Sequence, residues 1–240
     1  MIVKMIGTGA ILATRFSASA LIDDKILIDV PNGAMKQIRR LGNKPENIDV
    51  VLLTHFHGDH YFDMPFLLFE QGLIRKREAP LHVVAPRGES YKIKDLFLRG
   101  YEEETYEKLA QNTMLNIIEI DRDEEIELEG YKIKAVKVEH TDSLKTLGYI
   151  IRKDGKSFGY TGDARLCDGI IAILNKTEKT VMDVSFIQKH DMHVGLEEAE
   201  ELGAKYKEKC EIIATHMCDD VRSQEVKYIK IADDGDVFEV

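Results

Sequence analysis

The chain has 240 residues, of which 44 % are apolar, and a formal net charge of −10. This length and composition are typical of a folded globular domain. The acidic balance disfavours a protein that wraps a long nucleic acid, because phosphate contacts are made by Lys and Arg, and it favours a small ligand. Cys167, Cys210 and Cys218 form no Cys-x-x-Cys pair, and no apolar run is long enough to cross a bilayer. We therefore expect a cytoplasmic protein that does not contact a membrane.

The first half of the chain alternates short apolar runs with helical patterns. Strands are expected at residues 2–6, 18–22, 25–30, 50–53 and 81–85, and helices at 33–41 and 61–71. Pro65 is tolerated because it falls in the first turn of the second helix. Residues 90–112 are highly charged and predict helix. This segment either caps a functional site or forms a solvated helical pair outside the core.

The second half repeats the pattern of strands followed by helices. Strands are expected at residues 117–120, 126–128, 131–139, 147–151, 157–160, 181–184, 212–214, 226–231 and 237–238, and helices at 166–174 and 197–209. The loose twofold pattern predicts two sheets packed face to face with helices outside. We expect one domain over residues 1–240, with a helical insertion at about 88–114.

A cluster of polar residues directly follows the buried strand at 50–53. His55, His57, Asp59 and His60 lie within six positions, and Gly58 allows the backbone to turn sharply between them. Imidazole and carboxylate are ligands that Zn²⁺, Mn²⁺ or Fe accept. Two ions about 3.5–4 Å apart could share these side chains. The alternative, a surface loop that happens to be rich in His, is disfavoured because three of the eight histidines of the chain are here.

Further polar residues follow other predicted strands. His140, Asp163 and His216 each come after an apolar run. Each alone is typical of a surface residue, but strand ends on one edge of a sandwich converge, and together with the first cluster they supply seven ligands. Asp29 follows the strand at 25–30, and two roles stay open for it. It either holds a ligand histidine by a hydrogen bond or caps the helix that starts near Gly33.

Four motifs of the chain resemble those of the metallo-β-lactamase superfamily, in the same order. They are His55-x-His57-x-Asp59-His60, Val138-Glu139-His140, Tyr160-Thr161-Gly162-Asp163 and Ala214-Thr215-His216. The resemblance implies an α/β fold, a four-layer αββα sandwich, with a site for two divalent metal ions. It implies that one ion is held by His55, His57 and His140, that the other is held by Asp59, His60 and His216, and that Asp163 bridges them.

Finer features resemble ribonuclease Z and its phosphodiesterase relatives. These are Gly7-Thr8-Gly9, the run from Thr54 to His60, His140-Thr141-Asp142-Ser143, and Met192-His193-Val194-Gly195. The last match makes His193, and not His190, the candidate for an additional catalytic histidine. From the residues alone, His193 is typical of a surface residue at the start of a helix. Asp59 is the second candidate catalytic residue.

The resemblance implies a metal-dependent hydrolase in which a hydroxide held by the metals attacks a phosphodiester, with zinc preferred and manganese or iron as alternatives. Ribonuclease Z enzymes that bind tRNA usually carry a long arm, often between the third-motif His and the bridging Asp. Here residues 141–162 supply two strands and leave no room for an arm. We therefore expect a small anionic substrate, a phosphodiester or cyclic phosphate, and disfavour nucleic acid.

Three alternatives to this function stay open. The first is a hydrolase of a lactone, ester or thioester on the same site. The second is a tRNA 3′ endonuclease like ribonuclease Z. The third, from another class, is a metal-binding scaffold without catalytic activity, which usually goes with loss of ligands. Formation of a homodimer is also left open.

Overall fold

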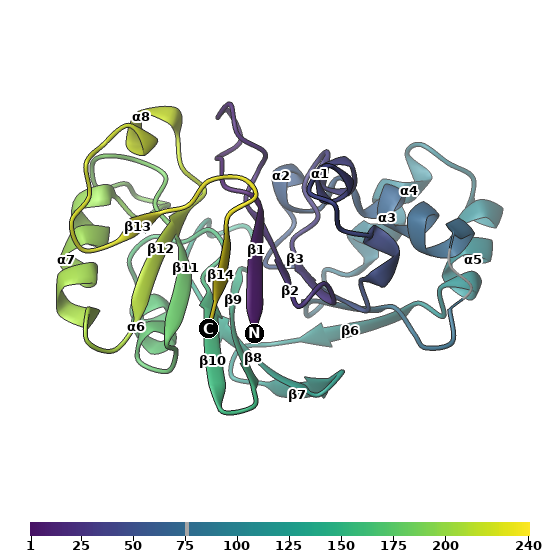
Figure 1. The fold of residues 1–240 in the computed structure, drawn as a ribbon. Helices are drawn as coiled ribbons and strands as arrows, with labels where there is room; N and C mark the ends of the chain where they lie inside the picture. The colour runs from purple at the N-terminus through teal and green to yellow at the C-terminus, as the bar shows by residue number, and fades with distance from the viewer. Residues whose placement is uncertain (75–76) are drawn as a thin grey trace.

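The computed structural model describes residues 1–74 and 77–240, and the strands of these residues form two seven-stranded sheets (Figure 1). The first sheet has, in spatial order, β14 (Val237–Glu239), β1 (Ile2–Gly7), β2 (Ser19–Ile22), β3 (Ile26–Ile28), β4 (Val50–Leu52), β5 (His82–Pro86) and β6 (Asn116–Ile120). The second has β13 (Lys230–Ile231), β12 (Glu211–Thr215), β11 (Lys179–Asp183), β10 (Lys156–Tyr160), β9 (Leu147–Lys153), β8 (Tyr131–Lys137) and β7 (Glu125–Leu128).

Helices cover the outer face of each sheet (Figure 1). The first sheet carries α1 (Ala34–Arg40), the 3₁₀ turn Pro45–Asn47, α2 (Gly58–Tyr61), α3 (Met64–Phe69), the π turn Glu70–Ile74, α4 (Tyr91–Leu98) and α5 (Glu103–Asn112). The second sheet carries α6 (Asp168–Leu174), α7 (Leu196–Tyr206) and α8 (Asp219–Arg222). The chain therefore has the four-layer αββα sandwich of the metallo-β-lactamase fold, as the sequence predicts.

The layers follow from strands that are apolar on both faces. In β3, Ile26 and Ile28 point into the core between the sheets, while Leu27 points into the core under the helices. In β4, Val50 and Leu52 face the core between the sheets, and Val51 faces the core under the helices. Because successive side chains of a strand point to opposite faces, such runs need cover on both sides. The second sheet and the helical layer provide that cover.

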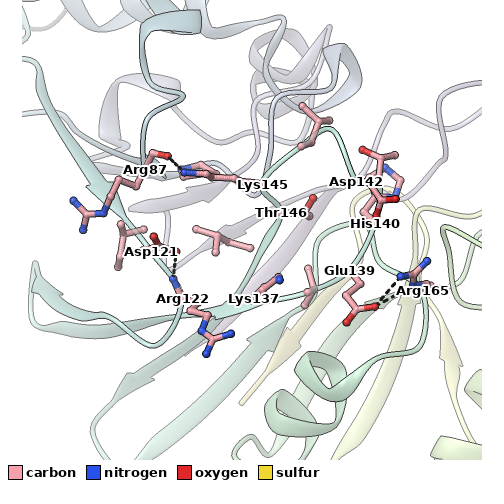
Figure 2. Close-up of a pocket in the computed structure, with 16 residues that line it drawn as sticks. Arg87, Asp121, Arg122, Lys137, Glu139, His140, Asp142, Lys145, Thr146 and Arg165 are labelled. Atoms are coloured by element: carbon pink, nitrogen blue, oxygen red, sulfur yellow. Dashed lines mark hydrogen bonds and ion pairs between the residues drawn. The ribbon is translucent and has the colours of Figure 1, made fainter.

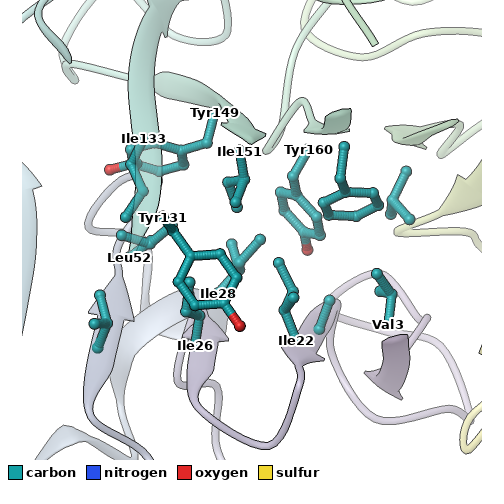
Figure 3. Packing of buried hydrophobic residues seen from close by; sticks show 14 of the residues in the cluster. Val3, Ile22, Ile26, Ile28, Leu52, Tyr131, Ile133, Tyr149, Ile151 and Tyr160 are labelled. Atoms are coloured by element: carbon teal, nitrogen blue, oxygen red, sulfur yellow. The ribbon is translucent and has the colours of Figure 1, made fainter. Parts of the chain in front are cut away.

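Tyrosines of the second sheet fill the core between the sheets (Figure 3). Tyr149 and Tyr160 are paired across β9 and β10, and both are buried. The Tyr149 hydroxyl donates a hydrogen bond of 2.7 Å to the carbonyl oxygen of Leu53. This bond ties the second sheet to the residue that precedes the Thr54–His60 run. The Tyr160 hydroxyl, by contrast, has no hydrogen-bond partner in the part of the chain that the structure describes.

The helix expected at 61–71 begins earlier and is broken. Helix α2 starts at Gly58, and α3 starts again at Met64. At the break, the Asp63 N–H donates to the Val30 carbonyl at 2.9 Å, and the Asp63 carboxylate accepts the N–H of Met35 at 3.0 Å. Asp63 thus caps the first turn of α1. These contacts hold the backbone of Asp63 outside a continuous helix between α2 and α3.

The charged segment at 90–112 forms two helices, α4 and α5, rather than one continuous helix. Ile93, Phe97, Tyr106 and Leu109 from these helices join the core under the outer layer. The alternative of a solvated pair outside the core is therefore wrong. The single-domain organisation, the reading of 88–114 as an insertion and its role as a cap remain predictions.

The C-terminal segment differs most from expectation. The strand expected at 226–231 is reduced to β13, Lys230–Ile231, beside β12. The last strand, β14, does not extend that sheet but pairs with β1 in the other sheet, with Val3 opposite Phe238. The two chain ends therefore lie side by side (Figure 1). No helix among the described residues is both long enough and apolar enough to cross a membrane.

The Tyr149 hydrogen bond predicts a stability difference between two similar variants. Tyr149→Phe should lower the free energy of unfolding by about 1–2 kcal/mol, because the buried Leu53 carbonyl loses its partner. Tyr160→Phe removes a hydroxyl of the same core that has no partner, so its effect should stay within about 0.5 kcal/mol. Urea denaturation monitored by circular dichroism measures both. Equal destabilisation by the two substitutions would contradict this assignment of the hydrogen bond.

Candidate metal centre

The candidate ligands lie at one edge of the sandwich because their strands run in the same direction. Strands β3, β4 and β5 are parallel, and so are β10, β11 and β12. Strand β8 is antiparallel to β9, which is antiparallel to β10, so β8 also ends at this edge. The structure brings all seven predicted ligands together there, in groups whose ligand atoms lie within 4.8 Å of one another.

The first group consists of His55, His57 and His140. The Nε2 atom of His55 lies 3.0 Å from Nδ1 of His57, and Nε2 of His140 lies 3.2 Å from the same Nδ1 atom. Ligands held tetrahedrally at about 2.0–2.1 Å from a zinc ion are about 3.3 Å apart. These spacings therefore suit three nitrogen ligands of one ion.

The second group consists of Asp59, His60 and His216. The Oδ2 atom of Asp59 lies 3.4 Å from Nε2 of His216 and 3.7 Å from Nε2 of His60. The His60 Nε2 atom is buried and has no hydrogen-bond partner within the described residues. A buried polar atom without a partner is costly, and a bound cation would satisfy it. This group also fits a divalent ion.

Asp163 lies between the two groups. Its Oδ1 atom is 3.3 Å from Nε2 of His60, and its Oδ2 atom is 3.2 Å from Nε2 of His216 and 3.9 Å from Nε2 of His140. The preceding Gly162 has φ 60° and lies so close to the first sheet that a Cβ atom would meet Thr54 Cβ at 2.9 Å. Glycine thus allows the close approach that carries Asp163 to the histidines of the first sheet.

Four of the ligand histidines have their second ring nitrogen fixed by an oxygen atom. The pairs are His55 Nδ1 with Thr54 Oγ1 at 3.0 Å, His60 Nδ1 with Asp29 Oδ2 at 2.8 Å, His140 Nδ1 with the Met192 carbonyl at 3.0 Å, and His216 Nδ1 with Ser185 Oγ at 2.8 Å. Such contacts fix the orientation of each ring and aim Nε2 at the centre.

Asp29 therefore has the first of the two roles left open by the sequence. It holds His60 and also accepts hydrogen bonds from the N–H and the hydroxyl of Thr54, at 2.8 and 2.9 Å. The other role, capping the helix near Gly33, belongs to Asp63. Burial raises the pKa of the Asp29 carboxyl, and the contact with His60 opposes that rise.

The electrostatics of the first group favour neutral imidazole. Burial lowers the pKa values of His55, His57 and His140, and that of His55 lies well below its ordinary value. Removal from water disfavours the charged form of an imidazole. Because metals bind the neutral form, these three rings are already in the state that a metal requires.

The pKa values of the second group depend on neighbouring carboxylates. Burial opposes charge on His60 and His216, but neighbouring carboxylates, Asp163 foremost, raise the pKa of both histidines. Burial likewise opposes ionisation of Asp163, but His216 and His60 hold its pKa well below the usual range. The carboxylates thus favour positive charge on these histidines. A bound divalent cation would supply that charge in place of protons.

His216 is held in a strained conformation. Its φ is 55°, in the left-handed region that residues other than Gly seldom adopt. The Ser185 hydroxyl donates a hydrogen bond of 2.8 Å to the His216 carbonyl, and the following Met217 N–H donates to the Thr8 carbonyl at 3.0 Å. Strain of this kind persists only where the surrounding structure enforces it, and it is common at functional sites.

His193 lies beside the candidate ligands, and His190 is not among them. The His193 ring stacks on His216, with ring centroids 5.4 Å apart, and its Nδ1 atom is 2.7 Å from Asp183 Oδ2. Burial lowers the pKa of His193, but the hydrogen bond with Asp183 outweighs it and raises the pKa above its ordinary value.

Sequence reasoning missed Asp183 and Ser185. Asp183 ends β11, which lies between β10 and β12, so it reaches the same edge as Asp163 and His216. The Ser185 hydroxyl lies 2.5 Å from Asp183 Oδ1, and Asp183 Oδ2 also accepts the Ala164 N–H at 3.0 Å. The rule that led to the other strand-end ligands could have found Asp183, because a strand was expected at 181–184.

Comparisons with known proteins agree with this geometry. A family model described as "Anti-Pycsar protein Apyc1" matches residues 1–236. The chain is 25 % identical to the ribonuclease Z of Pyrococcus abyssi in an alignment of 263 positions, gaps included, that covers 85 % of this chain and 82 % of the relative. It is 32 % identical to the ribonuclease Z of Pyrococcus horikoshii over 159 residues, which cover 64 % of this chain and 48 %, about half, of that relative.

Solved structures share the fold. The metallo-β-lactamase fold protein YhfI from Bacillus subtilis gives a TM-score of 0.78 at 20 % identity, over 99 % of this chain and 98 % of that one. A diphosphatase from the PhnP family gives a TM-score of 0.76 at 22 % identity, over 100 % of this chain and 97 % of that one. The protein is a metallo-β-lactamase-fold hydrolase of the ribonuclease Z-like group. Within it, the chain belongs to the family described as anti-Pycsar protein Apyc1.

The contact between Asp29 and His60 predicts an effect on metal affinity. Asp29→Asn should weaken metal binding about 10–100-fold, because the amide no longer provides the carboxylate that orients and polarises His60. Asn is the suitable replacement because Asp29 has φ 57°, which Asn tolerates. Competition with a chromophoric chelator measures the affinity.

Asp63→Asn is the matched control, since it changes a buried carboxylate that caps α1 instead of holding a ligand. It should leave metal affinity within about twofold of the wild type. Wild-type affinity in Asp29→Asn would contradict the role assigned to Asp29.

Proposed function

We propose that this protein is a phosphodiesterase with two divalent metal ions that hydrolyses a small phosphodiester or a cyclic phosphate. The observation that carries the proposal is the position of Asp163, whose carboxylate oxygens lie 3.2–3.9 Å from histidines of both ligand groups. A carboxylate in contact with two ligand groups suits a pair of ions rather than one. Paired ions at such a site are typical of phosphate-ester hydrolysis.

Each ion has its own protein ligands in this proposal. His55, His57 and His140 would hold one, Asp59, His60 and His216 the other, and Asp163 both. Zinc is preferred for this donor set, with manganese or iron as alternatives. When bound, such ions supply activated water and neutralise the charge of phosphate oxygens. Asp59, at the edge of the second group, is the ligand proposed to orient the reacting water.

His193 is the proposed proton donor to the leaving oxygen. Asp183 holds its Nδ1 atom at 2.7 Å, so the proton available for transfer is on Nε2. Burial lowers the pKa of His193, but the hydrogen bond with Asp183 raises it above its ordinary value, which favours the protonated ring. An alkoxide is a poor leaving group, so protonation by a positioned acid contributes about 10²–10⁴-fold. A lactone or thioester needs such help less, and a histidine in this place therefore favours phosphodiester chemistry.

The relatives support the reaction class. Their names, ribonuclease Z and diphosphatase, describe enzymes that act on phosphate linkages. Residues 141–162, where ribonuclease Z enzymes often carry an arm, are used here largely by β9 and β10. Together with the net charge of −10, this favours a small substrate over tRNA.

A panel of substrates tests the proposal. The metal-loaded protein should hydrolyse bis(p-nitrophenyl) phosphate, with far weaker activity on a lactone and no cleavage of a precursor tRNA. A chelator should abolish the hydrolysis, and zinc or manganese should restore it, because the site depends on the cations. Faster turnover of the lactone than of any phosphodiester would sink the proposal in favour of the ester hydrolase.

The role of His193 is tested separately. His193→Ala should lower kcat by about 10²-fold or more on a phosphodiester with an alkoxide leaving group, such as a 3′,5′-cyclic nucleotide, because the general acid is lost, with two metals retained. The loss on bis(p-nitrophenyl) phosphate should be smaller, because its leaving group needs no protonation. His190→Ala is the matched control, since that ring lies near His193, with centroids 5.7 Å apart, but packs on Phe186. It should change kcat less than about twofold. Loss of metal from His193→Ala would mean that His193 is a ligand.

A further inference from the structure

Arg165 lies close to the candidate metal centre and contacts two of its segments. Its side chain lines a pocket of about 520 Å³ whose wall also includes His140 (Figure 2). The Nε and Nη2 atoms of Arg165 donate to Glu139 Oε2 at 3.1 and 2.9 Å, and the Nη1 atom donates to the carbonyl of Asp191 at 3.3 Å. No step of the proposed reaction uses this arginine, so its contacts need another explanation.

The side chain of Arg165 is not needed to hold Glu139 in place. The backbone N–H of Arg165 already donates to the Glu139 carbonyl at 2.8 Å. The two charged side chains are 43 % and 49 % exposed, and an exposed ion pair contributes little to the stability of a fold. The ion pair instead fixes the plane of the guanidinium, so that Nη1 is directed at the carbonyl of Asp191.

The segment that accepts this hydrogen bond carries His193. Residues 187–194 form no backbone–backbone hydrogen bond with any part of the chain that the structure describes. Loops without such bonds open more readily than the elements around them. The position of this segment therefore depends on contacts with side chains.

Three consecutive residues of the segment contact three different parts of the site. The contacts are Asp191 carbonyl with Arg165 Nη1 at 3.3 Å, Met192 carbonyl with His140 Nδ1 at 3.0 Å, and His193 Nδ1 with Asp183 Oδ2 at 2.7 Å. The last contact fixes only one atom of the His193 ring. The direction of its Nε2 atom depends also on the backbone, which Arg165 holds two residues earlier.

We infer that Arg165 is a positioning residue, which holds the backbone of this segment so that the His193 ring meets the leaving oxygen. This inference rests on the proposed phosphodiesterase activity, in which His193 donates the proton. In this role Arg165 touches neither the substrate nor the metals. It acts through His193, so its effect should appear only where that proton is needed.

The leaving group of the substrate separates this role from a structural one. Arg165→Met keeps most of the side-chain length but removes the guanidinium. On a 3′,5′-cyclic nucleotide, whose leaving group is an alkoxide, kcat should fall about tenfold, because a misplaced acid loses part of its contribution. On bis(p-nitrophenyl) phosphate, whose leaving group needs no protonation, kcat should fall less than about twofold. Equal losses on the two substrates, or no loss on either, would overturn the inference.

The variant should remain folded and loaded with metal. Its melting temperature should stay within about 2 °C of the wild type, because the lost ion pair is exposed. It should retain two zinc ions, since the contact between the Met192 carbonyl and His140 remains. Loss of a zinc ion would mean that Arg165 supports the ligands and not the acid, and it would overturn the inference.

A double substitution tests whether Arg165 acts through His193. In the His193→Ala background, Arg165→Met should change kcat on the cyclic nucleotide less than about twofold, because the group that Arg165 positions is absent. A further tenfold loss in that background would show that Arg165 acts by another route, which is contrary to the inference.

Arg87→Met is the matched control. Arg87 lines the same pocket, and its ion pair with Glu124 is exposed to a similar degree, 48 % and 47 %. The substitution removes the same charge, but it removes no hydrogen bond or ion pair to residues 187–194. Its kcat should stay within about twofold of the wild type on both substrates. A tenfold loss on the cyclic nucleotide would assign the effect to charge at the pocket and overturn the inference.

A measurement without turnover separates this inference from the proposed function. The His193 ring stacks on His216 with the ring planes 11° apart, so its ring-proton NMR signals report its position. In zinc-loaded Arg165→Met these signals, assigned by comparison with His193→Ala, should move or broaden. In Arg87→Met they should keep their wild-type positions.

The two proposals can therefore fail separately. If the wild type hydrolyses neither substrate but the His193 signals change as expected, the phosphodiesterase proposal fails and the positioning of His193 by Arg165 stands. If both substrates are hydrolysed but the His193 signals are unchanged in Arg165→Met, the inference fails and the proposed function stands.

Discussion

The contact of one carboxylate with histidines from both sheets is the interaction on which the rest of the site depends. Asp163 reaches His60 from the first sheet and His216 and His140 from the second. These groups are buried, and burying charged or unpaired polar groups is unfavourable unless they are matched. Hydrogen bonds satisfy these groups only in part, since the Nε2 atom of His60 has no hydrogen-bond partner among the residues that the structure describes. Paired cations at the same place would satisfy every one of these atoms.

The surrounding structure keeps the ligand rings in position. Asp29, Ser185, Thr54 and a backbone carbonyl each hold the far nitrogen of one histidine. Asp29, Thr54 and Ser185 follow strands β3, β4 and β11 closely, whereas the carbonyl of Met192 comes from the loop before α7. The Tyr149 hydroxyl adds a bond from the opposite sheet to Leu53, just before the His-rich turn. The core thus positions the site.

Much of the fold could be predicted from the sequence, because strands and ligands leave local signals. Apolar runs predicted the two layers of strands, and polar residues directly after them predicted where His140, Asp163 and His216 would meet. The break at Asp63 could not be predicted, because it depends on a hydrogen bond to Met35 in a different helix. The pairing of β14 with β1 is likewise a contact between the two ends of the chain.

Other features could not be predicted from the sequence for a similar reason. Asp183 lay inside the strand expected at 181–184 and had no family motif to draw attention to it, and its contact with His193 spans a loop. The pocket beside His140 is assembled from residues after β5, β6 and β8 and from one loop. Nothing in the spacing of these residues along the chain indicates that they surround a cavity. Long-range geometry of this kind is visible only in three dimensions.

The metal content of the protein tests the central claim most directly. Native mass spectrometry of chelator-stripped protein titrated with zinc should show two ions per chain in the wild type and at most one weakly held ion in Asp163→Ala, since Asp163 contacts both ligand groups. One ion or none in the wild type, or two firmly held ions in Asp163→Ala, would contradict the account.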